Sequence, residues 1–204
     1  MKYITTLRPF IVLSIVGFLS ATALRAAELL IPDNVIFERG IEYSNPDDQH
    51  LQLNLARPKE ATGPLPVVLC IHGGGFRAGH RDGHNAVCLK LAQRGFVVFC
   101  PRCFLWQNAA DYNAAVAQHK SRHPSSLGMA KMLYDAMRGV DVLASLPYVD
   151  ENRLGAVGHS LGAKEALYLA AFDERIVAAV ASEGGITFRS TNWDAPWYLG
   201  PQIR

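Results

Sequence analysis

Residues 153–171 decide the fold that we expect, and they read RLGAVGHSLGAKEALYLAA. The segment Arg153–Gly158, apolar after its first residue, is typical of a strand covered on both faces. Leu161 to Ala171 then predicts a helix, so Gly158-His-Ser-Leu-Gly162 falls on the turn between strand and helix. Glycines are needed there because side chains would collide with neighbouring backbone. The pattern predicts Ser160 as an exposed nucleophile, and the alternative is a structural serine.

A second motif, His72-Gly-Gly-Gly-Phe76, follows the apolar strand expected at Val67–Ile71. Consecutive glycines let the backbone pass close to a ligand and turn its amides toward it. The first amides of the helix after Ser160 are also suited to a developing negative charge. The two motifs therefore predict an oxyanion hole with Gly74, Gly75 and Leu161 as donors, whereas a lone glycine loop would simply be flexible.

The rest of the chain alternates strands with helices. Strands are expected at Val35–Tyr43, Leu51–Ala56, Val67–Ile71, Phe96–Cys100, Arg153–Gly158 and Ile176–Ala181. Helices are expected at Asn85–Arg94, along the apolar stripe Leu133–Ala144, and at Leu161–Ala171. The first two strands alternate in polarity and predict antiparallel edge strands, while the last four predict buried parallel strands. The fold class is therefore α/β, with a mostly parallel sheet and helices on both faces.

One segment, Pro101–Ser126, fits neither the strand period nor the helix period. Stretches of this length inside a compact domain are uncommon and often form lids or pocket walls. The segment is either a lid or a simple insertion.

Composition and charge exclude several classes of protein. The chain has 204 residues, 50% of them hydrophobic and 19% charged, which excludes a disordered or coiled-coil protein. Beyond residue 26, 17 Lys and Arg (20 minus 3) face 18 Asp and Glu, a net charge of −1. This balance, without a basic run, predicts neither nucleic acid nor an anionic membrane surface as a partner.

The amino terminus has the layout of a secretory signal peptide. Lys2 and Arg8 precede an apolar run over residues 10–19, which is followed by small residues. We expect a signal peptide at 1–26, cut after Ala23 or Ala26, a domain at 27–204, and a secreted or periplasmic protein. A retained anchor is the alternative, although the apolar run is about half the length of a membrane span.

The four cysteines do not predict a metal site. Cys70 lies within an apolar run and is expected to be a buried small hydrophobe. Cys100-Pro-Arg-Cys103 lacks a second cysteine pair or paired histidines, so a local disulfide or two inert thiols is expected. No metal and no cofactor is predicted.

With these motifs the sequence resembles the α/β-hydrolase superfamily. HGGGF and LAQRGFVV look like carboxylesterases of the acetyl esterase and feruloyl esterase type. GHSLGAKEALYLAAFDERIVAAVASEGG is similar to bacterial acetyl xylan esterases and dienelactone hydrolases, and to glucuronoyl esterases. The resemblance implies a secreted serine esterase acting on acyl esters of polysaccharide or on small esters. It also implies a substrate-binding role for Lys164, although Leu161 replaces the arginine of the glucuronoyl esterases.

Glu183 is the expected catalytic acid. It follows the strand Ile176–Ala181 at its carboxyl end, where active sites of open α/β sheets form, and the resemblance points to the same position. The alternative is a loop glutamate that pairs with Arg175 or Arg189. Asp194 is a weaker candidate.

The catalytic base is missing from the expected place. The superfamily order is nucleophile, acid and histidine, yet all seven histidines precede Ser160. His119 and His123 would approach only if the segment around Trp106 folded over the site. The superfamily core also has about eight strands and only six are expected here. We therefore expect a carboxyl-terminally truncated esterase with little turnover alone. The alternatives are a prolyl oligopeptidase-like peptidase and a non-catalytic binding protein.

Overall fold

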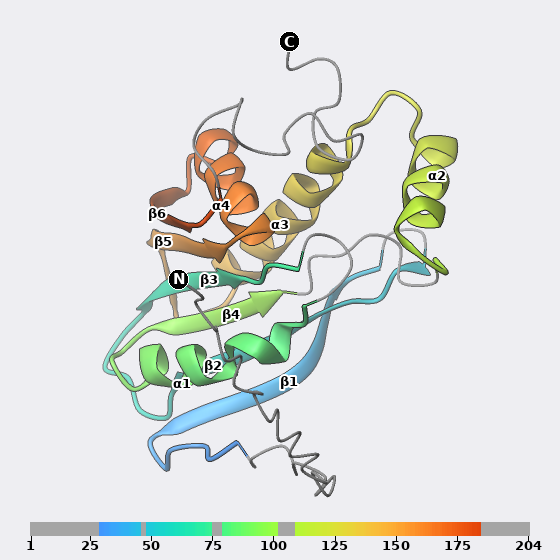
Figure 1. The fold of residues 1–204 in the computed structure, drawn as a ribbon. Coiled ribbons are helices and arrows are strands. Elements are labelled where there is room, and N and C mark those ends of the chain that lie inside the picture. Colours follow the sequence, from blue (N-terminus) through green and yellow to red (C-terminus); the bar gives the residue numbers. More distant parts are fainter. Residues whose placement is uncertain (1–28, 46–47, 75–78, 102–108, 185–204) are drawn as a thin grey trace, which may run out of the picture.

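The computed structural model describes residues 29–45, 48–74, 79–101 and 109–184 (Figure 1). In these residues six strands form one sheet in the order β1-β2-β4-β3-β5-β6. The strands are β1 (Val35–Ser44), β2 (Leu51–Pro58), β3 (Leu65–Ile71), β4 (Val97–Pro101), β5 (Val149–His159) and β6 (Ile176–Ser182). The helices are the 3-10 helix η2 (Arg81–His84) and the α-helices α1 (Asn85–Ala92), α2 (Tyr112–Arg122), α3 (Gly128–Ala144) and α4 (Leu161–Phe172). The expected α/β class is confirmed.

The sheet lies between two helical layers, with α1 on one face and α3 and α4 on the other (Figure 1). The larger core fills the α3 and α4 side and includes Leu69, Phe99, Met132, Leu143 and Leu169. The smaller core lies under α1 and includes Ala56, Cys70, Cys88, Leu89 and Cys100. Both faces of the central strands are therefore covered, which explains their continuously apolar sequences.

The register of the parallel strands positions the two sequence motifs. β3 and β5 pair in parallel, and Ile71 lies opposite Gly158. Both strands therefore end at the same edge of the sheet. The glycine loop after β3 and the serine turn after β5 are brought side by side by this register alone.

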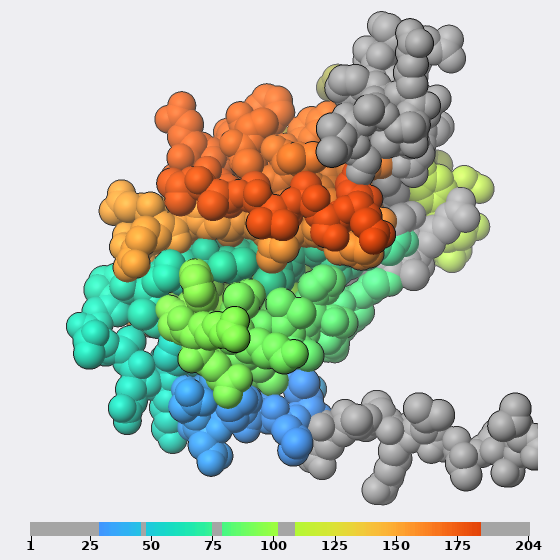
Figure 2. Space-filling view, turned by 60° about the vertical axis from the view of Figure 1, so that its left-hand side comes forward, coloured from blue at the N-terminus to red at the C-terminus, as the bar shows by residue number. Residues whose placement is uncertain are grey.

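Two strand predictions were wrong about neighbours. β2 is not an edge strand, because it pairs antiparallel with both β1 and β4. β6 was expected to be buried, yet among the described strands it forms the outer edge beyond β5 and all its residues after Ile176 are exposed. Figure 2 shows its red-orange residues at the molecular surface.

The segment Pro101–Ser126, expected to lack a helical period, contains α2. The side chain of Asp111 caps this helix by accepting a hydrogen bond from the amide of Ala114 at 2.9 Å. Ala115 packs into the larger core. Because α2 buries few side chains, its sequence shows no apolar stripe at helical spacing. The capping residue Asp111 is therefore the stronger local signal of this helix.

Several expectations lie outside the described residues. These are the signal peptide, Gly75, Cys103, Trp106, Arg189 and Asp194. In the part of the chain that the structure describes, no helix is long and apolar enough to cross a membrane.

Candidate active site

Ser160 occupies a strained turn between β5 and α4. Its φ is 54° and its ψ −114°, a backbone conformation that residues other than glycine rarely adopt. An added Cβ at Gly158 would lie 2.0 Å from the carbonyl oxygen of Gly162. An added Cβ at Gly162 would lie 2.2 Å from the carbonyl oxygen of Ile71. Both glycines of the motif are therefore required by close backbone packing.

The glycine loop after β3 packs directly on this turn. A Cβ at Gly73 would lie 2.8 Å from the carbonyl oxygen of His159 and 3.0 Å from the Cβ of Ser160. The next residue, Gly74, has a φ of 128°. Gly74, one of the expected amide donors, directly follows Gly73, and Gly73 packs against Ser160.

The amino terminus of α4 begins at the serine. The carbonyl of Ser160 accepts hydrogen bonds from the amides of Ala163 at 3.1 Å and Lys164 at 3.4 Å. The earlier amides, including that of Leu161, have no acceptor within the helix. Together with the helix dipole they favour negative charge beside Ser160.

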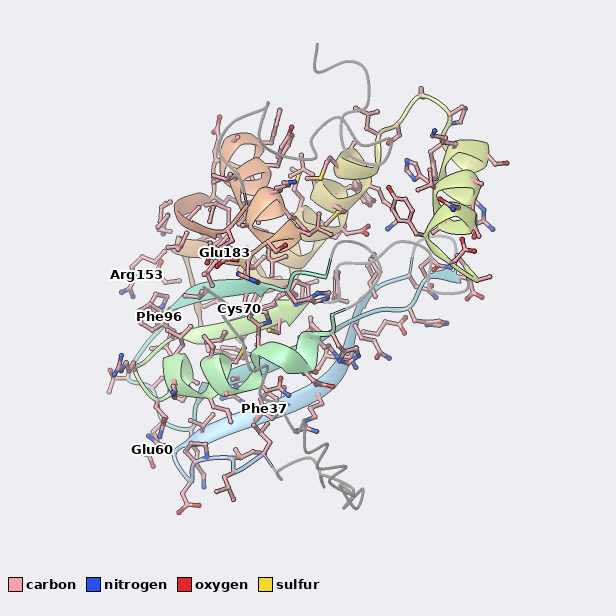
Figure 3. All side chains as sticks on the ribbon, viewed as in Figure 1. Phe37, Glu60, Cys70, Phe96, Arg153 and Glu183 are labelled. Atoms are coloured by element: carbon pink, nitrogen blue, oxygen red, sulfur yellow. The ribbon has the colours of Figure 1, made fainter. Side chains whose placement is uncertain are left out.

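Glu183 lies beside the serine turn at the end of β6 (Figure 3). The amide of Ser160 donates a hydrogen bond to the carbonyl of Ser182 at 2.8 Å, which holds the two strand ends together. Glu183 has a φ of 59°, and its Oε2 is 3.9 Å from Nε2 of His159. Its side chain is 78% exposed, so the carboxylate is open to a second group.

Lys164 lies in the first turn of α4 and is only 5% exposed. Burial lowers the pKa of its ammonium group. A lysine in this position is a buried cation within one helical turn of the serine.

Two buried histidines, His72 and His119, lie within hydrogen-bond distance of backbone carbonyls. Nδ1 of His72 lies 2.7 Å from the carbonyl oxygen of Gly73, and the ring is buried. Nε2 of His119 lies 3.0 Å from the carbonyl oxygen of Ser126, and its ring is 5.5 Å from that of His123. Among the described residues no imidazole nitrogen is hydrogen-bonded to the hydroxyl of Ser160.

The three described cysteines, Cys70, Cys88 and Cys100, are free and form a buried cluster. Cys70 is fully buried, as expected, and lies under α1 (Figure 3). Cys100 has a free thiol whose Sγ is 3.3 Å from Sγ of Cys88. Hydrogen bonds with Cys70 and Cys88, together with burial, raise the pKa of the Cys100 thiol. In the described ranges no group of histidine, cysteine or acidic side chains is arranged to hold a metal ion.

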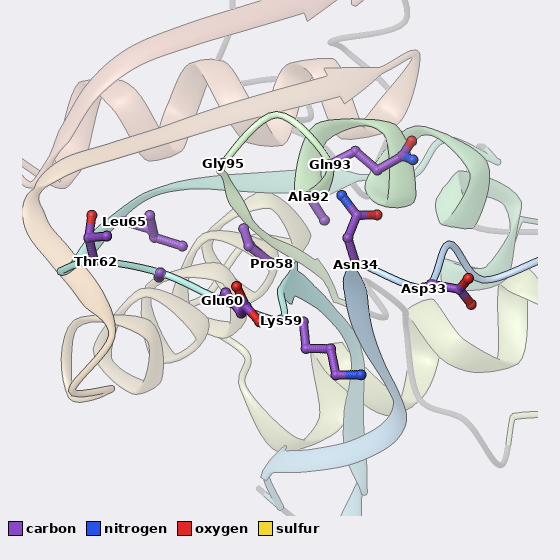
Figure 4. Close-up of a pocket in the computed structure, with 11 residues that line it drawn as sticks. Asp33, Asn34, Pro58, Lys59, Glu60, Thr62, Leu65, Ala92, Gln93 and Gly95 are labelled. Carbon is purple, nitrogen blue, oxygen red and sulfur yellow. The ribbon is translucent and has the colours of Figure 1, made fainter.

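A hollow of about 960 Å³ lies at the other end of the sheet (Figure 4). It is lined by residues near the end of β2 and the end of α1, among them Lys59, Glu60 and Gln93. Sites in open parallel sheets form at the carboxyl ends of the strands, and this hollow adjoins the amino ends. It is therefore separate from the serine turn.

Sequence reasoning missed Asn54 of β2, which is 1% exposed and anchors the segment after the glycine loop. Gly79, at the other end of that loop, was also missed. β2 reads Leu-Gln-Leu-Asn-Leu from Leu51, so Asn54 stands at an alternate, polar position of the strand and the local pattern carries no signal of its burial.

Known proteins share this fold. A model of the dienelactone hydrolase family matches residues 51–196. A protein of Klebsiella pneumoniae assigned as a dienelactone hydrolase is 24% identical with a TM-score of 0.57, and the match covers 75% of this chain and 61% of that one. Esterase B of Lactobacillus rhamnosis is 24% identical with a TM-score of 0.52, over 71% of this chain and 42% of that one. No curated protein sequence matches the chain.

These comparisons differ in what they establish. At such identities the solved structures are evidence of the fold alone, and the chain spans less than two thirds of their length. The family model, in contrast, covers well over half of this sequence. The chain therefore belongs to the dienelactone hydrolase family, with an α/β-hydrolase fold.

Proposed function

We propose that the protein is a serine-dependent carboxylic ester hydrolase with Ser160 as its nucleophile. The observation that carries the proposal is the strained backbone of Ser160, held at the carboxyl edge of the sheet with Gly73 packed against it. Strain of this kind is concentrated at functional sites. Family membership supports ester hydrolysis as the reaction class.

The proposed reaction proceeds through an acyl-enzyme. Oγ of Ser160 attacks the ester carbonyl carbon and gives its proton to a base, while the carbonyl oxygen becomes an oxyanion. The amides of Gly74, Gly75 and Leu161 bind that oxyanion. The alcohol then leaves with the proton from the base. Water attacks the acyl-serine and gives a proton to the base, and Oγ of Ser160 leaves with that proton as the acid is released.

We assign Glu183 to orientation of the base and Lys164 to contact with the substrate. The carboxylate of Glu183 is exposed beside the serine turn, where it would stabilise an imidazolium. The proposed substrates are small acyl esters or acyl groups on polysaccharide.

We also propose export with removal of residues 1–26. The amino-terminal sequence of exported protein should begin after Ala23 or Ala26.

Reaction with a p-nitrophenyl alkylphosphonate tests the nucleophile. Because no described imidazole is bonded to Ser160, the reaction is run with and without free imidazole as a soluble base. We expect one phosphonyl group on Ser160, located by peptide mass mapping, and faster modification in imidazole.

Two variants complete the design. Ser160→Ala should abolish the adduct, whereas Ser145→Ala, a serine at the far end of α3, should leave it unchanged. A folded protein that remains unmodified at Ser160 in imidazole would contradict the esterase proposal and favour a non-catalytic binding protein.

A further inference from the structure

Asn54, itself buried, is the centre of a hydrogen-bond network on the α1 side of the sheet. Its Nδ2 donates to Oδ1 of Asp82 at 2.7 Å and to Oδ1 of Asn85 at 3.0 Å. Its Oδ1 accepts from Nε of Arg81 at 3.0 Å and from the amide of Gly40 at 3.2 Å. An amide side chain has two donor hydrogens and two acceptor lone pairs, so all four are used.

The partners of Asn54 come from three separate parts of the fold. Gly40 lies at an irregularity in β1, where the register with β2 shifts. Arg81 and Asp82 belong to η2, and Asn85 begins α1. Although burial would raise it, hydrogen bonds from Asn54 and Asn85 hold the pKa of the Asp82 carboxyl below its ordinary value. A single amide thus fixes η2 and the start of α1 on the sheet.

η2 is directly connected to the end of the glycine loop. His80 caps η2, since its Nδ1 accepts from the amide of Asp82 at 3.2 Å. Gly79 precedes it with a φ of 90° and packs so tightly that a Cβ there would lie 2.2 Å from the carbonyl oxygen of Gly73. Gly73 in turn touches Ser160. The contacts therefore run without a break from Asn54 through η2 and Gly79 to the serine turn.

We propose that Asn54 is a positioning residue, whose amide holds η2 and Gly79 so that Gly73 stays packed against Ser160 and the amide of Gly74, the next residue, stays in place. This role rests on the proposed serine chemistry. Donors of an oxyanion hole must be aimed within tenths of an ångström, and a loop of glycines does not hold such a position by itself. The network acts on the chemical step and not on substrate affinity, because Asn54 is buried away from solvent.

Exchanging the amide of Asn54 and the carboxylate of Asp82, in two steps, tests the network. Asn54→Asp keeps the acceptor that Arg81 uses, but it removes both donor hydrogens and places a carboxylate against that of Asp82. We therefore expect Asp82 and Asn85 to lose their contacts with the sheet and η2 to shift. The rate of the phosphonylation step at saturating reagent should fall about tenfold, part of the loss seen when an oxyanion donor is removed, while the reagent's dissociation constant stays within threefold. Adding Asp82→Asn restores complementarity, because the amide introduced at 82 donates to the carboxylate introduced at 54. The double variant should recover most of the rate.

Leu53→Ala is the matched control for stability. Leu53 precedes Asn54 on the same strand, is 2% exposed, and faces the larger core instead of η2. This variant should lower the melting temperature and leave the phosphonylation step within threefold of the wild type. An unchanged rate in Asn54→Asp, or a loss no greater than in a Leu53→Ala variant of equal stability, overturns the proposal.

Amide hydrogen exchange separates this proposal from the esterase proposal. Exchange at His72 to Gly74 and at Gly79 should rise in Asn54→Asp, return in the double variant, and change less in Leu53→Ala. Absence of any adduct on wild-type Ser160 overturns the esterase proposal. In that case the amide hydrogen exchange rates still test whether Asn54 positions the glycine loop. Unchanged exchange at these amides in Asn54→Asp overturns the positioning role.

Discussion

At Ser160 the backbone takes a positive φ that costs of order 1–3 kcal/mol for a residue with a side chain. The conformation persists because the contacts around it leave no alternative. The amide of Ser160 is bonded to Ser182, and the flanking glycines are packed against the carbonyls of Gly162 and Ile71. Tight backbone packing, rather than hydrogen bonding of the hydroxyl, sets the position of the serine.

Gly162→Ala tests this packing. The added methyl group would meet the backbone of Ile71 at 2.2 Å, so β3 or α4 must shift. We expect a loss of about 1–3 kcal/mol in the free energy of unfolding and slower phosphonylation of Ser160. Gly63→Ala is the matched control, because nothing lies within 4 Å of its added Cβ. Denaturant unfolding measures the free energy of unfolding of both variants. Equal values for Gly162→Ala and Gly63→Ala would count against tight packing at Gly162.

Asp173 provides a pH-dependent contribution to stability. Its carboxylate, 4% exposed, accepts hydrogen bonds from Nε and Nη2 of Arg175 at 2.8 and 2.6 Å. These bonds hold the pKa of Asp173 below its ordinary value despite burial. A carboxyl with a lowered pKa in the folded state stabilises the protein above its unfolded-state pKa of about 3.9, and that stability is lost as the pH falls through the folded pKa.

Asp173→Asn should therefore cost about 2 kcal/mol at pH 7 and flatten the fall in melting temperature below about pH 4. Asp150→Asn is the control. Asp150 also pairs with an arginine, Arg153, but that arginine side chain is 55% exposed and the pair is screened by water. A melting temperature equally sensitive to acid in wild type and Asp173→Asn would contradict this account.

At the scale of elements, α3 packs closely on the sheet at Gly139. A Cβ there would lie 3.0 Å from Cε1 of Phe99, the large side chain at the middle of β4. Phe99 is 1% exposed, and its ring meets that of Tyr43 of β1 edge to face, with centroids 5.7 Å apart. One ring therefore joins α3, β4 and β1.

Phe99→Ala should lower the free energy of unfolding by about 3–5 kcal/mol, because it leaves a cavity at this junction. Phe172→Ala makes the same change on the exposed end of α4, where the side chain is 63% exposed. It should cost less than about 1 kcal/mol. Thermal unfolding of the two variants compares them, and similar costs would argue against a central role for Phe99.

The sequence predicted the elements well and their neighbours less well. Apolar runs such as Val67–Ile71 identify buried strands, since burial on both faces needs apolar residues at every position. In β2, the alternating Leu51, Leu53 and Leu55 indicate that one face of the strand is buried. The other face is also buried, but it carries Ala56 and the amide of Asn54, so the sequence does not show that burial.

The candidate site was predictable only in its local parts. The serine motif and glycine loop are local patterns with fixed backbone needs, so the sequence reveals them. The network around Asn54 joins residues up to 31 positions apart, and no local period records such a pairing. The apolar run of β6 indicates a strand but does not tell how many neighbours that strand has.

At the scale of the whole molecule, the uncharged strand β6 forms an edge of the described sheet. Val177 and Val180 are 64% and 60% exposed, and the strand contains no charged residue. An apolar edge without charges is a template for pairing with another chain.

Val177→Lys should therefore reduce concentration-dependent self-association, measured by sedimentation velocity, with little change in melting temperature. Val87→Lys, on the outer side of α1, is the control and should leave association unchanged. Equal association in wild type and both variants would show that β6 is not the adhesive edge.

The three thiols between α1 and the sheet have a practical consequence for kinetics. Cys70, Cys88 and Cys100 are each 1% exposed or less, and they lie in one cluster. A thiol reagent reaches these sulfurs only when α1 separates from the sheet, so their alkylation rate follows the frequency of that opening. Labelling over time thus measures the breathing of the α1 layer without any introduced probe.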